Sequence, residues 1–136
     1  GFDGDYEFDE FVIHIFKRIF NSFDANARFL HNDAQGLITA KHLKDIDVNM
    51  FNFSFQHSLG EIRQLAGPEV VLVGNIPPRD VLAAGTPEQV REAVRKAAGE
   101  IEDHSRILWS AGGGMPPEVK NENILAFISA VKEFAK

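Results

Sequence analysis

Apolar positions along the 136-residue chain follow two patterns that alternate from one end to the other. Some runs are short, apolar and closed by a polar or glycine-rich loop, which is typical of β-strands. Between them, apolar residues recur at i, i+3, i+4 and i+7, which is typical of amphipathic helices. This alternation predicts an α/β fold of repeated βα units on a parallel sheet. We expect four strands, over residues 27–33, 48–54, 70–75 and 106–112.

The segments around the strands predict helices over 5–23, 37–45, 58–66, 87–99 and from about residue 121 onward. The clearest local signal is Thr86-Pro87-Glu88-Gln89, because it combines a capping box with proline at the first helical position. The last helix is expected to bury an apolar face. That face comprises Ile124, Phe127, Ile128, Val131, Phe134 and Ala135.

Composition limits the functions that the chain can have. The net charge is −6 without a run of Lys or Arg, which disfavours nucleic acid and anionic membranes as partners. The chain has no Cys, so disulfides, thiolate metal ligands and cysteine nucleophiles from these residues are excluded. No apolar stretch approaches the roughly 18 residues of a membrane span, and the acidic start lacks a signal-peptide pattern. We therefore expect a soluble, cytoplasmic protein.

Chemistry on a parallel sheet is concentrated at the C-terminal ends of its strands. His31 and Asp33 lie two residues apart at the end of the first strand, so their side chains share a face. Such a pair can act in catalysis or bind a metal ion. The alternative is that His31 forms a hydrogen bond with a neighbour while Asp33 caps the next helix.

The other strand ends supply candidate substrate-binding residues. Phe51, Phe53 and Phe55 alternate with Asn52, Ser54 and Gln56, so we expect the phenylalanines to face helices and Asn52 and Ser54 to face inward. Asn75 ends the third strand and either contacts substrate or ties loop backbone together. Gly112-Gly113-Gly114 follows the fourth strand and forms a tight turn lining a pocket or binds an anion directly. His57 is a further candidate at the mouth.

Residues 73–82 and 85–90 resemble the seventh strand and following helix of the uroporphyrinogen decarboxylase superfamily, which includes corrinoid-dependent methyltransferases. Residues 110–117 with Glu122-Asn123-Ile124 resemble the eighth strand and last helix, and residues 29–33 resemble an earlier strand end. The resemblance implies that residues 1–136 form a single partial domain, the C-terminal half of a TIM (β/α)8 barrel. A missing N-terminal half or a second copy would complete it.

The methyltransferases of this superfamily hold zinc through a His-x-Cys pair and a Cys after the last strand. The matching positions here are His31, Asp33 and Gly113, and the decarboxylases commonly carry His at the position of Gly113. The resemblance therefore implies zinc on His31 and Asp33 at most, and no tightly bound cofactor. The favoured function is methyl transfer between a small-molecule substrate and a corrinoid on a partner protein. Uroporphyrinogen decarboxylase and a non-catalytic fragment or assembly subunit are the alternatives.

Overall fold

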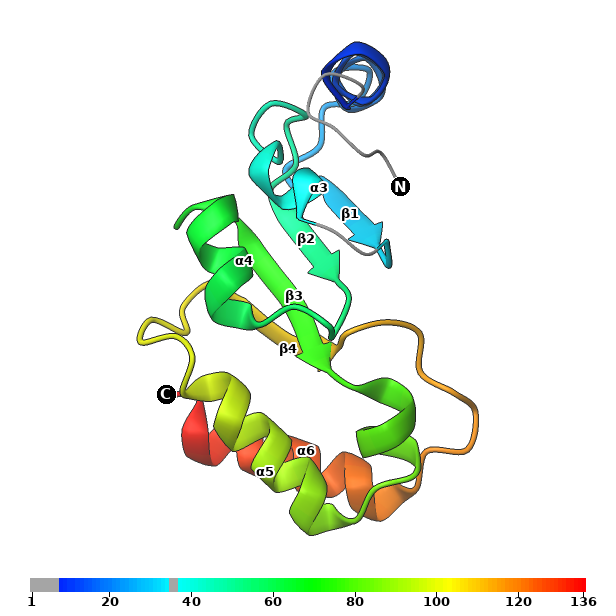
Figure 1. Cartoon of the computed structure of the whole chain (residues 1–136), viewed down its shortest axis with the longest axis vertical. Coiled ribbons are helices and arrows are strands. Elements are labelled where there is room, and N and C mark those ends of the chain that lie inside the picture. The colour runs from blue at the N-terminus through cyan, green and yellow to red at the C-terminus, as the bar shows by residue number, and fades with distance from the viewer. Residues whose placement is uncertain (1–7, 35–36) are drawn as a thin grey trace.

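Four parallel strands lie side by side in the order of the sequence, β1-β2-β3-β4 (Figure 1). This computed structural model describes residues 8–34 and 37–136. The four predicted strands are confirmed, and helices separate them, as in half of a (β/α)8 barrel. The strands are β1 (Phe29–Asn32), β2 (Met50–Phe53), β3 (Val71–Ile76) and β4 (Ile107–Ala111).

The helices agree with the sequence patterns in part. The predicted helix over 5–23 is helical over Phe8–Phe20, turns follow it, and residues 5–7 lie outside the described residues. The predicted helix over 37–45 is wrong beyond Lys41, where turns replace it. No helix in 8–34 or 37–136 is long and apolar enough to cross a membrane. The helical segments are η1 (Phe8–Ile13, π-helical), α2 (His14–Phe20), α3 (Ile38–Lys41), α4 (Leu59–Ala66), η2 (Pro78–Ala83, π-helical), α5 (Pro87–Ala98) and α6 (Asn121–Phe134).

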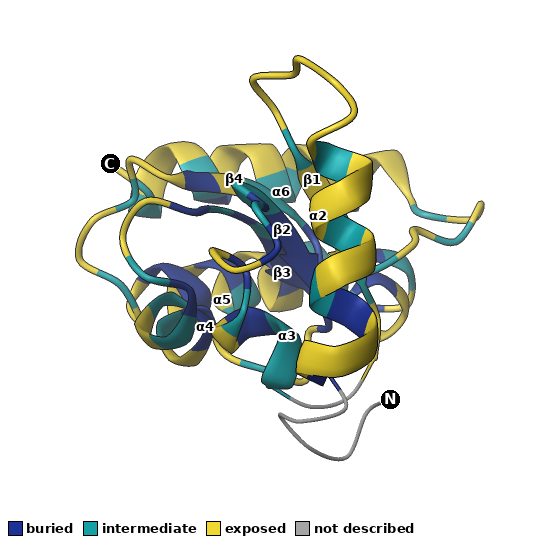
Figure 2. Ribbon diagram, turned by 90° about the horizontal axis from the view of Figure 1, so that it is seen from above, coloured by how far each residue is buried: buried dark blue, intermediate teal, exposed yellow. Residues whose placement is uncertain are grey.

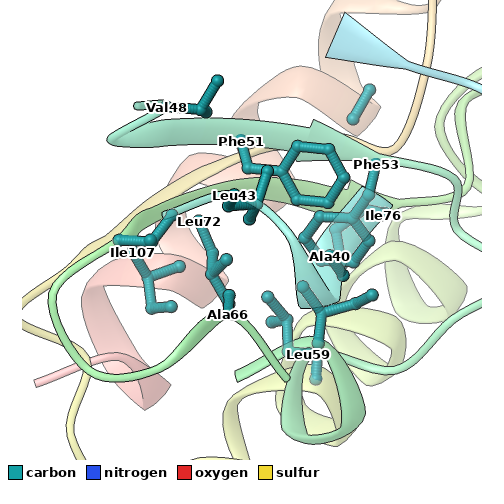
Figure 3. Packing of buried hydrophobic residues seen from close by; sticks show 14 of the residues in the cluster. Ala40, Leu43, Val48, Phe51, Phe53, Leu59, Ala66, Leu72, Ile76 and Ile107 are labelled. Atoms are coloured by element: carbon teal, nitrogen blue, oxygen red, sulfur yellow. The ribbon is translucent and has the colours of Figure 1, made fainter. Parts of the chain in front are cut away.

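One face of the sheet carries the hydrophobic core. The register places Phe51 of β2 beside Leu72 of β3, and Leu72 beside Ile107 of β4, so these side chains point to the same face. Figure 3 shows this face packed against Leu59 and Ala66 of α4. Phe51 and Phe53 are buried as predicted, whereas Phe55 lies beyond the strand and is 42% exposed.

The opposite face of the sheet is less covered. Phe29 on β1 and Leu108 on β4 point to this face from the two edge strands, and they are 49% and 50% exposed. Figure 2 shows the contrast between the buried central strands and the largely exposed α2. In a closed barrel this face would be the interior, where side chains from further strands would cover it.

The capping box at the start of α5 is confirmed. The hydroxyl of Thr86 accepts a hydrogen bond from the backbone N–H of Gln89, and the Gln89 side chain accepts one from the backbone N–H of Thr86. These bonds satisfy two N–H groups that a helix start otherwise leaves unpaired.

The predicted buried face of α6 is confirmed in part, since Phe127, Val131 and Phe134 pack against the core. Asn123 is fully buried and donates hydrogen bonds to the carbonyls of Leu82 and Gly85. Asn123 and Ala130 also face inward, while Ile124 and Ile128 are 36% and 44% exposed. The buried face is therefore shifted around the helix toward Asn123, the residue that makes the polar contact.

The exposed sheet face predicts that the 136-residue chain associates in solution. Edge strands with free backbone groups and exposed apolar side chains favour pairing with another chain. We expect light scattering to detect dimers or larger species, and Leu108→Ser to shift them toward monomer. The matched control is Leu125→Ser on α6, which removes an equally apolar, 64% exposed side chain away from the sheet. A wild-type monomer at high concentration with a sharp melting transition would contradict the half-barrel account.

Candidate functional site

The C-terminal ends of the strands surround a pocket of about 320 Å³. Three of the residues expected at the site line it, namely Asp33, Ser54 and Gly113. Arg79 and Asp80 of η2 also line it, and the sequence patterns did not identify them because η2 itself was not predicted. The pocket therefore combines two carboxylates, one guanidinium and a buried hydroxyl at the end of the sheet where parallel folds carry their chemistry.

His31 and Asp33 contact each other at this end of the sheet. The ring nitrogen Nε2 of His31 lies 3.0 Å from Oδ2 of Asp33. The other ring nitrogen, Nδ1, lies 2.5 Å from Oδ1 of Asn52, the residue that the parallel register places beside His31. The side chains of His31 and Asp33 remain 46% and 60% exposed, so the pair is open to a ligand.

Asn52 connects this pair to the rest of the sheet. Its side chain is buried, and Nδ2 donates hydrogen bonds to the carbonyls of Val73 on β3 and Ala111 on β4. Neighbouring strands are about 4.8 Å apart, so one short side chain on β2 reaches β4 only where the sheet curls toward it. Asn52 therefore marks the concave face, which corresponds to the interior of a barrel.

These contacts restrict where the protons of the pair lie. Carbonyl oxygens only accept, so both N–H bonds of the Asn52 amide point to Val73 and Ala111, and its oxygen faces His31. Nδ1 of His31 must then be the donor to that oxygen. The contact between Nε2 and Asp33 needs a second proton, because two lone pairs would otherwise face each other. The geometry thus corresponds to an imidazolium paired with a carboxylate, or to a neutral imidazole paired with a carboxyl group.

The glycine-rich turn lies against the same pair. A Cβ added at Gly113 would be 3.5 Å from Oδ1 of Asp33, so the third position identified by the resemblance lies next to the second. Gly112 packs on the backbone of Phe55, where an added Cβ would lie 2.8 Å from the backbone nitrogen. Its own N–H donates to the carbonyl of Ile76. This close packing explains why glycine occupies position 112, in a tight turn that borders the pocket.

Two other predicted residues lie in a neighbouring pocket of about 320 Å³. Asn75 is buried, and its amide donates a hydrogen bond to the carbonyl of His57, so it ties the loop after β2 to the end of β3. His57 is half-buried, and its Nδ1 lies 3.5 Å from a carboxylate oxygen of Glu61. The structure does not bring these two residues into contact with the pair of His31 and Asp33.

The donor set at the site is smaller than a zinc ion requires. Catalytic zinc sites use three protein ligands. Among the described residues no group of three His, Cys, Asp or Glu side chains could hold a metal ion. His31 and Asp33 supply two donors, and Gly113 supplies none at the third position. The described residues by themselves therefore do not fit a zinc centre.

Comparison with known sequences identifies the family. A sequence profile of the family described as uroporphyrinogen decarboxylase (URO-D) matches residues 4–134. The chain belongs to the uroporphyrinogen decarboxylase family. The four parallel strands in sequence order agree with the partial barrel expected for this family.

Curated members of the uroporphyrinogen decarboxylase family are much longer than this chain. The uroporphyrinogen decarboxylase of Dichelobacter nodosus is 24% identical over 130 residues, which are 96% of this chain and 37% of that protein. The uroporphyrinogen decarboxylase of Pseudomonas syringae pv. syringae is 30% identical over 100 residues, or 74% of this chain and 28% of that protein. The matched regions thus span between 28% and 37% of the length of these relatives.

A solved structure gives the same result for the fold. The chain superimposes on a methyltransferase from Methanosarcina mazei with a TM-score of 0.82 at 18% identity. The match covers 98% of this chain and 38% of that one. Nearly the whole chain therefore matches part of a URO-D-like barrel.

The close packing of Gly112 predicts a specific loss of stability in this family member. We expect Gly112→Ala to lower the free energy of unfolding by about 1–3 kcal/mol, because the new methyl group collides with the backbone of Phe55. Gly114→Ala is the matched control, since an added Cβ there has nothing within 4 Å. Gly114→Ala should change the free energy of unfolding by no more than about 0.5 kcal/mol. Urea unfolding measures both, and equal effects would contradict the packing of the turn.

The donor count predicts weak metal binding at this site. We expect metal analysis of the purified full-length protein to find well below one zinc ion per chain on His31 and Asp33. One imidazole nitrogen and one carboxylate, without a third protein ligand, hold zinc poorly. His31→Ala should leave the metal content unchanged. One zinc ion per chain in the wild type, lost in His31→Ala, would show that the site is completed by residues outside those described.

Proposed function

We propose that this chain supplies the C-terminal half of a closed (β/α)8 enzyme that moves a methyl group between a small substrate and a corrinoid carried by a partner protein. His31 and Asp33 are its catalytic pair, and Ser54 and Gly113 line the substrate pocket. The remaining strands come from an N-terminal half or from a second copy of the chain. The reaction takes place in the cytoplasm.

One observation carries this proposal. The three positions that resemble the ligand positions of the methyltransferases converge on one spot, since His31 contacts Asp33 and Gly113 adjoins Asp33. A glycine in the third position leaves space beside the carboxylate that a substrate can occupy. The hydrogen bond between Nε2 and Asp33 needs a proton, and both side chains are partly exposed, which is the arrangement of a general acid.

The chemistry of a general acid suits the release of a methyl group from oxygen, nitrogen or sulfur. A reduced corrinoid on the partner protein would supply the acceptor for the methyl group, which leaves the substrate without its bonding electron pair. The substrate atom keeps that pair and takes the proton from Nε2 of His31, which becomes neutral. Asp33 remains beside Nε2 and stabilises the charged imidazolium before the transfer. Arg79 adds a cation at the rim of the pocket, where it would orient an anionic substrate group.

The second candidate is decarboxylation of a porphyrinogen, which the names of the curated relatives favour. The same proton would then pass to the carbon atom that loses carbon dioxide. Gly113 counts against this candidate, because the resemblance to the decarboxylases implies His at that position. The match covers only 37% of the relative from Dichelobacter nodosus. The resemblance implies that the substrate contacts of the N-terminal half lie outside it.

Activity assays on the full-length protein distinguish the two candidates. Methyl transfer to a reduced corrinoid is followed by the change in corrinoid absorbance, and decarboxylation is followed by chromatography of the oxidised porphyrins. We expect the first activity, and a decrease in kcat of about 100-fold or more in His31→Ala. The control is His14→Ala on the exposed face of α2, which should retain full activity.

Three results would overturn the proposal in different ways. Porphyrinogen decarboxylation that depends on His31 would establish the second candidate. Equal methyl-transfer rates in His31→Ala and the wild type would remove His31 from the site. The absence of both activities in a folded full-length protein with its corrinoid partner would support a non-catalytic role in assembly.

A further inference from the structure

The side chain of Asn52 is positioned for a role beyond substrate binding. We infer that Asn52 is a positioning residue that keeps the proton of neutral His31 on Nδ1, so that Nε2 alone exchanges protons at the mouth of the pocket. This inference rests on the proposed function for its catalytic meaning. Its physical content, the tautomer of His31, is independent of which reaction the enzyme performs.

The hydrogen bonds of Asn52 leave it no free polar group for a substrate. Both of its N–H bonds are directed to backbone carbonyls, of Val73 at 2.5 Å and Ala111 at 3.3 Å. Its oxygen faces Nδ1 of His31. The side chain is only 6% exposed, so a lost bond would leave a buried group unpaired.

A rotated amide would be much less favourable. Turning the group by half a revolution would place its oxygen against two carbonyl oxygens and its N–H groups toward His31. Two buried donor contacts would be lost and two repulsive contacts created. The carbonyls of β3 and β4 therefore fix the amide, and the amide oxygen fixes the proton on Nδ1.

This arrangement selects the tautomer that free histidine disfavours in water, where the neutral ring mostly carries its proton on Nε2. With the proton on Nε2, neutral His31 would donate to Asp33 and could not accept a proton from the mouth. With the proton on Nδ1, the lone pair of Nε2 faces Asp33, whose carboxyl group then carries the second proton and donates it to Nε2. The ring can then take up a proton at Nε2 and release it there, while Nδ1 stays bonded to Asn52.

Nitrogen NMR of histidine tests the inference, because the chemical shifts of the two ring nitrogens report the tautomer. The sample is the full-length protein with 15N-labelled histidine, at a pH where the ring of His31 is neutral, and the signals of His31 are assigned by their loss in His31→Gln. We expect a protonated Nδ1 and an unprotonated Nε2. An unprotonated Nδ1 in the wild type would overturn the inference whatever the activity.

Two variants separate positioning from a purely structural role. Asn52→Asp keeps an oxygen beside Nδ1 but loses both donors, so neutral His31 should keep its proton on Nδ1. Asn52→Leu removes the acceptor, so the proton should move to Nε2, with a loss in kcat of about 10- to 100-fold. If both variants leave the tautomer on Nδ1, Asn52 serves only to join strands.

The same experiment distinguishes this inference from the proposed function. A protonated Nδ1 that is lost in Asn52→Leu, in a protein without methyl-transfer activity, would uphold the positioning by Asn52 and reject the reaction. An unprotonated Nδ1 in an active enzyme would reject the positioning and uphold the reaction. The wild-type spectrum alone decides the tautomer, so an unprotonated Nδ1 would reject the positioning even if neither variant folds.

Discussion

The buried amide of Asn52 is the contact on which the site depends, because it joins all four strands of the sheet. From β2 it binds the ring of His31 on β1 and the carbonyls of Val73 on β3 and Ala111 on β4. These bonds form only if the strands are parallel, in register, and curled toward the face that Asn52 occupies. The curvature of the sheet and the orientation of His31 are therefore linked through this one side chain.

The strand ends show how this family scaffold can carry different chemistry. Gly113 brings backbone rather than a side chain to the position beside Asp33, and Gly112 lets the turn pack directly on Phe55. The result is a paired imidazole and carboxylate next to open space. In the proposed function, this pair transfers a proton and the open space takes a substrate group, without a third protein ligand. The proposed function thus depends on a few loop residues, whereas the fold depends on the sheet.

Local signals in the sequence were enough to predict the strands and the helix α5. The strands follow from apolar runs closed by polar loops, and α5 follows from Thr86 and Gln89, whose hydrogen bonds are contained within one turn. The contact between His31 and Asp33 was also accessible, because alternate residues of a strand share a face.

Features that depend on contacts between distant segments could not be predicted in this way. The inward position of Asn123 on α6 depends on its bonds to the η2 region, more than 35 residues earlier in the chain. The role of Asn52 depends on the register between β1 and β2 and on carbonyls from two further strands. Arg79 and Asp80 were missed because no periodic pattern marks a single π-helical turn.

A crystal structure of the full-length protein tests the central claim most directly. The account predicts that β1 and β4 each gain a further parallel neighbour, that Phe29 and Leu108 become buried inside a closed barrel, and that His31 and Asp33 face its mouth. Edge strands that remain open to solvent would contradict this account. So would a barrel in which the face carrying Asn52 points outward.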